Sequence, residues 1–300
     1  MSIIVNNVTK LYGKQKALDN ISFEVRSGEI IGFLGPNGAG KSTMMKIITC
    51  YIPPTEGTVK VCGFDINEQS MKVRMQIGYL PEHNPLYLDM YVKEFLEFVG
   101  GIHNVKNLKN RVKEMIDLTG LEAEQKKKIG ALSKGYRQRV GLAQAIIHDP
   151  KVLIMDEPTT GLDPNQLEEI RGLIKTLGKE KTVLLSTHIM QEVEAVCDRV
   201  IIINKGEIVA NDSTSTLQKN TIKQIITVEF DKAVSKNDLQ KIEGVNEVKN
   251  TEGNTWQLIS SAESDIRKAV FDFAVKNNLG VLTLNKDEQK LEDVFKHLTK

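Results

Sequence analysis

The chain has 300 residues, a formal net charge of +1 and a hydrophobic fraction of 40%. This length predicts one large or two ordinary domains, and the apolar content is sufficient for packed cores. A net charge so close to zero argues against a general nucleic-acid-binding protein, so we expect no nucleic-acid partner. Cys50, Cys62 and Cys197 form no C-x-x-C pair, which argues against a structural zinc site and a disulfide framework.

The sequence predicts no route into or across a membrane by itself. The first residues lack a basic segment followed by an apolar core, so no secretory signal is predicted. No apolar run approaches the ~20 residues that a helix needs to cross a bilayer. We therefore expect a cytoplasmic chain that is soluble or attached to a membrane through a partner.

The first segments predict strands at residues 3–5 and 17–25, with a turn at Tyr12-Gly13-Lys14 between them. Two interpretations of Tyr12 stay open at this point. Its ring is either a platform on which an adenine base stacks or a half-buried aromatic side chain of a strand.

The segment Gly35-Pro36-Asn37-Gly38-Ala39-Gly40-Lys41-Ser42 fits the phosphate-binding pattern G-x-x-x-x-G-K-[ST]. An apolar strand at residues 30–34 precedes it and an amphipathic helix at 43–48 follows, which is the context that the motif requires. The glycines let backbone N–H groups point at phosphate oxygens, and the helix N-terminus adds about half a positive charge. We expect Lys41 to bridge the β- and γ-phosphates of a nucleoside triphosphate, Ser42 to bind Mg²⁺, and Thr43 to belong to the same nucleotide site.

After this helix, Pro53-Pro54 predicts its end and residues 58–61 predict the next strand. A short strand at 77–82 is stopped by Pro81, and residues 84–150 are mostly helical, with Gly120 and Gly130 as expected helix ends.

Within that region, Leu132-Ser133-Lys134-Gly135-Tyr136 predicts the start of a helix with Ser133 as its N-cap. The segment is either an ordinary capped helix or a second phosphate site, because a helix N-terminus also attracts anions. The residues alone favour the first interpretation.

Residues 151–158 predict a strand with a continuous apolar run, typical of a parallel sheet, that ends in Asp156 and Glu157. Carboxylates at the C-terminal edge of such a sheet lie in its ligand crevice, so we expect Asp156 to hold Mg²⁺ and Glu157 to polarise the attacking water. The alternative is a pair of solvated acids. A turn at residues 161–164 leads to a helix that ends at Gly178. His188 follows the next strand, 182–186, at the same edge, which favours contact with the γ-phosphate over a structural role.

The last third begins with a hairpin at residues 199–209 and a polar stretch at 211–220, where we place a domain boundary. Domains of residues 1–220 and 221–300 result. The second has a β-α-β-β-α-β order, which predicts a small α+β ferredoxin-like domain. A last helix is expected around Leu291, Val294, Phe295 and Leu298. This domain holds no cluster of nucleophile, base or metal ligands, so we expect a regulatory or dimerising role.

Residues 3–220 resemble the ATP-binding subunit of an ABC transporter, because the motifs described above and Gly161-Leu162-Asp163 occur in that family's order. The resemblance implies an α/β P-loop NTPase fold with a β-rich lobe, a parallel-sheet core and a helical subdomain. It implies ATP and Mg²⁺ as cofactors and Tyr12 as the adenine platform. It also implies a head-to-tail homodimer in which residues 132–136 bind the ATP of the other subunit through Ser133 and Gly135, with Asp163 as a further nucleotide-binding residue.

The sequence departs from the family at two places. Glu82 stands where the family usually has a Gln that contacts Mg²⁺ and the lytic water, and a Glu can bind Mg²⁺ while adding charge. The resemblance therefore gives Glu82 a catalytic and a metal-binding role. Lys134 and Tyr136 replace residues of the common signature Leu-Ser-Gly-Gly-Gln.

Overall, the chain is most similar to export ATPases that act with a separate transmembrane permease, and among them to subunits linked to gliding motility. This resemblance implies a location on the inner face of the cell membrane. A soluble ABC ATPase that acts on ribosomes or DNA, and a small-molecule kinase, are the alternatives.

Overall fold

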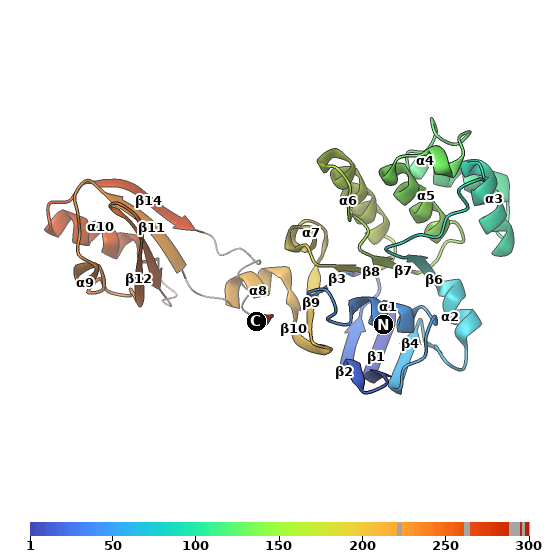
Figure 1. Ribbon diagram of the computed structural model, residues 1–300, viewed down its shortest axis with the longest axis horizontal. Helices are drawn as coiled ribbons and strands as arrows, with labels where there is room; N and C mark the ends of the chain where they lie inside the picture. Colours follow the sequence, from blue (N-terminus) through green and yellow to red (C-terminus); the bar gives the residue numbers. More distant parts are fainter. Residues whose placement is uncertain (221–223, 261–264, 288–294, 296–297, 300) are drawn as a thin grey trace. The chain divides into compact units, whose positions relative to one another are not determined.

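The computed structural model describes residues 1–300 except 221–223, 261–264, 288–294, 296, 297 and 300. The chain divides into two units, Met1–Thr214 with Thr299, and Ser215–Leu298 (Figure 1). This division falls within the polar stretch at residues 211–220. That residues 1–220 fold and function independently stays a prediction.

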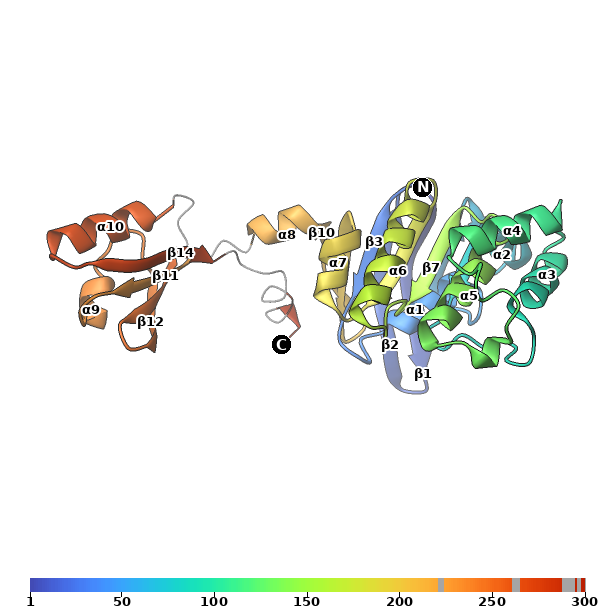
Figure 2. The same cartoon turned by 90° about the horizontal axis from the view of Figure 1, so that it is seen from above.

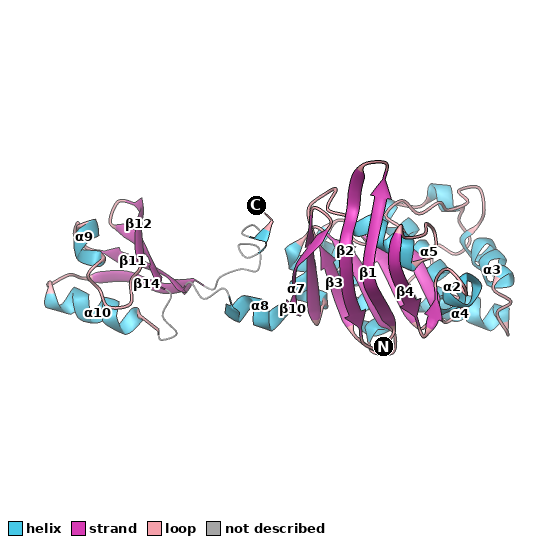
Figure 3. Ribbon diagram, turned by 90° about the horizontal axis from the view of Figure 1, so that it is seen from below, coloured by secondary structure: helices cyan, strands magenta, loops and turns pink. Residues whose placement is uncertain are grey.

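An antiparallel sheet forms the β-rich lobe of the first unit, with the strand order β2-β1-β4-β5 (Figure 3). The strands are β1 (Ile3–Tyr12), β2 (Gln15–Val25), β4 (Glu56–Val61) and β5 (Phe64–Asp65). β1 is longer than expected from residues 3–5, because register shifts along its pairing with β2 let the strand continue to Tyr12. The turn after Tyr12 then leads directly into β2.

A six-stranded sheet forms the core of the first unit, with the order β10-β9-β3-β8-β7-β6. Its strands are β3 (Ile30–Leu34), β6 (Ile77–Leu80), β7 (Val152–Asp156), β8 (Thr182–Thr187), β9 (Arg199–Asn204) and β10 (Glu207–Ser213). All are parallel except β10, which pairs with β9 as an antiparallel hairpin. The expected parallel core is confirmed, and its strands end at one shared edge.

Helices cover both faces of this sheet. α6 (Pro164–Gly178) and α7 (Met190–Val196) lie on one face and α1 (Lys41–Ile48) on the other (Figure 1). α1 ends at Ile48, as expected for the helix at residues 43–48, and Pro53-Pro54 lies beyond this end. Thr49 Oγ1 donates to Met45 O at 2.8 Å, and Cys50 takes a left-handed φ of 58° just after the helix. α6 begins with Pro164 and ends at Gly178, as the sequence predicts.

The helical subdomain contains α3 (Val92–Ile102), α4 (Leu108–Leu118) and α5 (Lys134–Ile146), which lie together in Figure 2. Gly120 follows α4 with a φ of 64°, as expected for a helix end. Gly130 does not end a helix, because it lies inside a 3₁₀ turn at Ile129–Ala131. α2 (Ser70–Gln76) and α7 were not expected from the sequence.

The second unit begins with α8 (Thr214–Asn220), apart from its first residue, and contains the expected β-α-β-β-α-β order. Its elements are β11 (Gln224–Phe230), α9 (Lys236–Leu239), β12 (Glu247–Glu252), β13 (Thr255–Ser260), α10 (Arg267–Lys276) and β14 (Val281–Asp287). The strands form an antiparallel sheet in the order β12-β13-β11-β14, which confirms the ferredoxin-like arrangement. The expected last helix falls mostly outside the described residues. None of the described helices is long and apolar enough to span a bilayer.

Candidate nucleotide-binding site

The phosphate-binding loop joins the end of β3 to the start of α1. Its backbone favours glycine at three places: Gly38 and Gly40 have φ values of 80° and 111°, and a Cβ on Gly35 would lie only 2.4 Å from Ile203 O. Gly206 N donates to Ala39 O at 3.0 Å, so the turn between β9 and β10 supports the loop from outside. The sequence therefore produces a tightly held loop at the carboxyl edge of the parallel sheet.

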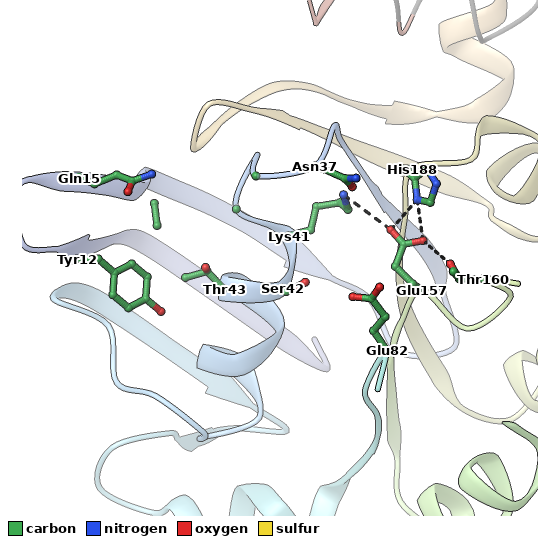
Figure 4. A pocket seen from close by; sticks show the side chains of 13 residues that line it. Tyr12, Gln15, Asn37, Lys41, Ser42, Thr43, Glu82, Glu157, Thr160 and His188 are labelled. Atoms are coloured by element: carbon green, nitrogen blue, oxygen red, sulfur yellow. Dashed lines mark hydrogen bonds and ion pairs between the residues drawn. The ribbon is translucent and has the colours of Figure 1, made fainter. Parts of the chain in front are cut away.

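A pocket of about 630 Å³ opens beside this loop (Figure 4). β1 and β2 form one end of it, and the ends of β7 and β8 form the other. Its lining residues are Tyr12, Gln15, Ala17, Asn37, Gly38, Gly40, Lys41, Ser42, Thr43, Glu82, Glu157, Thr160 and His188. Gly35, Pro36 and Ala39 belong to the loop but do not line the pocket. Tyr12 is the last residue of β1 and is 51% exposed, so its ring is accessible from the pocket, and its role as an adenine platform stays a prediction.

Lys41 is the buried cation of the pocket, with only 6% of its surface exposed. Its Nζ donates to Gly35 O at 2.8 Å and to Pro36 O at 3.2 Å, and lies 3.8 Å from Glu157 Oε1. Burial lowers the pKa of Lys41, while the charges of Glu157, Asp156 and Glu82 oppose that shift. Two backbone carbonyls therefore hold the ammonium group in place, and three carboxylates lie near it.

Glu157 is buried directly after β7, where its backbone adopts a left-handed φ of 51°. Such a conformation costs ~1–3 kcal/mol for a residue other than glycine. Glu157 N donates to Ser186 O at 3.0 Å, and its carboxylate accepts from His188 Nδ1 at 2.9 and 3.0 Å and from Thr160 Oγ1 at 3.2 Å. These bonds hold the strained residue and aim its carboxylate toward Lys41 (Figure 4).

Three oxygen-bearing side chains expected to bind Mg²⁺ lie at or next to the pocket. Ser42 and Glu82 line it, whereas Asp156 is buried at the end of β7 and accepts a hydrogen bond from Ser186 Oγ. The neighbouring Tyr79 reflects this environment, because burial and the Asp156 charge raise its pKa to about 12. Among the described residues no three His, Cys, Asp or Glu side chains could hold a metal by themselves. This donor set fits Mg²⁺, which usually keeps waters and phosphate oxygens beside one or two carboxylates.

Ser133, Gly135 and Asp163 do not line the pocket. Ser133 caps α5 by accepting from Tyr136 N at 3.4 Å, and Asp163 caps α6 by accepting from Gln166 N at 3.0 Å. A Cβ on Gly135 would lie 2.4 Å from Gln166 Oε1, so glycine lets Gln166 approach α5 closely. The N-cap expected at Ser133 is confirmed, and contact of these residues with a second nucleotide stays a prediction.

Sequence reasoning missed Gln15, Ala17 and Thr160 as lining residues. Gln15 and Ala17 reach the loop only because β2 folds back along β1. Thr160 could have been predicted, because it follows Glu157 by three residues and hydroxyls in turns often bond nearby carboxylates.

The comparisons with known proteins agree with this geometry. A family model described as ABC transporter matches residues 18–160. The linearmycin resistance ATP-binding protein LnrL of Bacillus subtilis is 34% identical over 301 residues, which cover 98% of this chain and 96% of LnrL. The chain belongs to the ATP-binding proteins of ABC transporters. This ABC ATPase is also 33% identical to the bacitracin transport ATP-binding protein BcrA of Bacillus licheniformis, covering 98% of the chain and 97% of BcrA.

A solved structure supports the same conclusion for the ABC ATPase. A dimeric ATP-binding cassette, determined in a post-hydrolysis state with ADP and Pi, is 30% identical with a TM-score of 0.65. The alignment covers 70% of this chain and 98% of that cassette. The α/β cassette fold and the ATPase activity of the family therefore apply to this chain.

Proposed function

We propose that this ABC ATPase is the nucleotide-binding subunit of an export system, in which closure of a head-to-tail homodimer on two ATP molecules drives a separate transmembrane permease. The observation that carries the proposal is the convergence of Lys41, Glu157 and His188 in one pocket beside the phosphate-binding loop. This arrangement supports binding and hydrolysis of ATP at a single site.

The chemistry follows from the neighbours of each group. Lys41 neutralises phosphate charge, and Glu157 accepts a proton from the water that attacks the γ-phosphate. His188 donates its Nδ1–H to Glu157, which orients the base beside the γ-phosphate. The Tyr12 ring stacks on adenine at the other end of the pocket, a contact of ~1–3 kcal/mol.

Mg²⁺ would be held by Ser42, Asp156 and Glu82 together with phosphate oxygens, and it would supply positive charge that offsets the charge on the transferred phosphoryl group. Glu82 extends from the segment after β6 into the pocket. Its carboxylate stands close enough to influence the pKa of Lys41. These contacts support a role for Glu82 in holding the metal and the lytic water.

The proposed dimer is supported by expected nucleotide-binding residues that do not line the pocket of their own subunit. Ser133 and Asp163 are exposed at the starts of α5 and α6 and are not among the residues that line the pocket. A helix start with an exposed hydroxyl suits a phosphate supplied by a second copy. The dimeric cassettes among the similar structures support a dimer of this subunit.

The membrane partner is supported by an exposed apolar cluster on the helical subdomain. Tyr87, Leu88, Tyr91 and Phe98 are each exposed by more than 40%, and the Tyr87 and Phe98 rings lie 5.7 Å apart. Clustered aromatics of this kind are typical of a protein interface. LnrL and BcrA are named for resistance and transport. The Nod factor export ATP-binding protein I of Sinorhizobium fredii is 39% identical over 69% of this chain and 61% of that protein.

We accordingly place the subunit on the inner face of the cell membrane, bound to its permease. A link to gliding motility stays a prediction from overall resemblance, and none of the relatives named above carries it. No observation favours the alternative of a soluble ABC ATPase acting on ribosomes or DNA.

Mixing two inactive variants tests the dimer. Ser133→Arg should block the site of the opposite subunit, and Lys41→Ala should block the subunit's own site. In a mixed dimer one site collects both defects and the other collects neither, so random pairing should restore up to about a quarter of wild-type sites. ATPase activity of each variant and of the mixture is measured over a range of protein concentrations.

The matched control is Ser235→Arg in the second unit, because Ser235 also caps a helix and accepts from Asp238 N at 3.2 Å. This control should lose a cap and keep its ATPase activity. Full activity of Ser133→Arg alone, at a specific rate independent of protein concentration, would contradict the dimer.

A further inference from the structure

A buried carboxylate lies outside the pocket, and the chemistry described above does not use it. Glu192 is in the first turn of α7 and only 2% of its surface is exposed. It accepts a hydrogen bond from Thr159 Oγ1 and another, at 2.6 Å, from Thr187 Oγ1. Both threonines are themselves buried. One carboxylate therefore bridges two segments that are 28 residues apart in the sequence.

The two bridged threonines adjoin the residues that act on ATP. Thr187 ends β8 and immediately precedes His188, and its Oγ1 also accepts from Ile189 N at 3.0 Å. Thr159 lies two residues after Glu157, in the turn that continues to Asp163, and its carbonyl accepts from Leu162 N at 3.2 Å. Glu192 thus fixes the turn after β7 against the end of β8.

We propose that Glu192 is a positioning residue for ATP hydrolysis, which holds Glu157 and His188 at their hydrogen-bonding distance by bridging Thr159 and Thr187. The inference rests on the proposed role of Glu157 as the base. The Glu157 carboxylate bonds to His188 and Thr160, and both partners are neighbours of a bridged threonine in the chain. Loosening either end of the bridge would let the base and its partner separate.

Packing alone does not account for a carboxylate at this place. A buried carboxylate is expensive to desolvate, and an apolar residue of similar size is often at least as stabilising. None of the ion pairs found among the described residues includes Glu192, so no cation offsets that cost by direct contact. The two threonine hydroxyls are the groups that hydrogen-bond the buried carboxylate. We infer that the carboxylate is placed here because these two bonds fix the distance between the turn after β7 and the end of β8.

The test removes one hydroxyl at a time in the full chain. Thr159→Val and Thr187→Val keep the size of the side chain and cut one end of the bridge. Each should lower kcat by between about tenfold and 100-fold, because a small displacement of catalytic groups has effects of this size. The KM for ATP and the ATP affinity measured by equilibrium dialysis should stay within about twofold, since neither threonine lines the pocket.

A matched control lies on the same strand. Thr182 is the buried first residue of β8, where its Oγ1 bonds Ser2 Oγ at 2.8 Å and accepts from Gly28 N at 3.1 Å. Thr182→Val loses comparable buried hydrogen bonds at the opposite end of the strand. It should lower the melting temperature as much as Thr187→Val and leave kcat unchanged. Equal kcat losses in both variants would mean that the bridge is only structural.

Two further measurements complete the test. Thr159→Ser keeps the hydroxyl and should restore most of the kcat lost in Thr159→Val. The double variant Thr159→Val/Glu192→Ala should be no slower than Glu192→Ala, because both cut the same bridge. Unchanged kcat in Thr159→Val, or effects that multiply in the double variant, would overturn the proposal. Glu157→Gln is run in parallel: if it turns over ATP normally, the role of Glu157 itself fails.

Discussion

The two units of the chain are both built around a sheet, but they differ in where polar side chains are buried. In the first unit the buried polar residues include Lys41, Asp156, Glu157, Thr187 and Glu192, which gather at the carboxyl edge of the parallel sheet. In the second unit, the part of the chain that the structure describes has Ser260 as its buried polar residue.

Strand direction accounts for this difference. Parallel strands all end at one edge, so polar residues that follow β3, β7 and β8 must converge there. Antiparallel strands such as β11 and β13 end at opposite edges, and their terminal residues are spread apart. The residues of the proposed chemistry therefore gather in the first unit, and a regulatory or dimerising role of the second unit stays a prediction.

The largest effect is expected from Glu157→Gln, which tests whether the acids at the carboxyl edge of the parallel sheet carry out ATP hydrolysis. The amide cannot accept a proton, so kcat should fall by about 1,000-fold while ATP still binds. Steady-state ATPase assays and equilibrium dialysis measure the two properties separately. Near-normal turnover would remove Glu157 from the role of base and open the search to other residues.

Lys41→Ala tests how the same site binds ATP. Removing the ammonium leaves the phosphates and Glu157 without their buried cation, and ATP affinity should fall about 100-fold. The control is Lys46→Ala, because Lys46 is an exposed lysine of the same helix. Tight ATP binding by Lys41→Ala in equilibrium dialysis would contradict the assignment of the loop.

A histidine pair predicts that the first unit loses stability in mild acid. His148 stacks on His103 with ring centroids 4.0 Å apart, and its Nε2 donates to Ile77 O at 3.0 Å. Burial and the neighbouring His103 lower the pKa of His148 to about 4. The unfolded chain therefore binds a proton near pH 6.5 that the folded chain does not, and the free energy of unfolding should fall by about 2–3 kcal/mol between pH 6.5 and 4.

His148→Gln measures this contribution by difference. The free energy of unfolding of the wild-type chain should drop more than that of the variant when the pH changes from 7 to 4.5, in urea titrations followed by circular dichroism. Trp256 is the single tryptophan of the chain and belongs to the second unit, so its fluorescence follows that unit separately. An equal pH dependence in both proteins would rule out His148 as the source.

The smallest effect is expected from removing the second unit. A chain that ends near Lys219 should keep a cooperative melt and change kcat by less than about twofold, because none of the residues that the structure describes after this point lines the pocket. Calorimetry and ATPase assays check both properties. An insoluble product, or one without a cooperative melt, would show that the boundary is misplaced.

The core and most of the pocket could be predicted because their signals are local. Residues 30–34, 152–155 and 183–185 are apolar runs. Asp156 follows the second run directly, whereas Lys41 and His188 follow the other two after six and two intervening residues. α2 and α7 escaped prediction, since helices of seven residues are too short for a clear apolar period.

Other features depend on contacts between distant segments. Gln15 reaches the pocket through the register of β1 with β2, and Glu192 meets Thr159 only after α7 packs on the sheet. The chain leaves α1 at Cys50, whose φ of 58° is left-handed, before it reaches Pro53-Pro54. A local pattern of apolar and polar residues does not encode strand register, the packing of a helix on a sheet or the backbone conformation at a helix end.

The left-handed backbone of Glu157 has a consequence for how variation at this position is filtered. A glycine there would adopt the φ of 51° without strain and would also remove a buried acid. We therefore expect a library selected only for abundance of folded protein to enrich glycine at position 157. A library selected for growth that needs the ATPase activity should keep glutamate. Opposite outcomes of the two selections would mark Glu157 as a residue that is retained for function at the expense of stability.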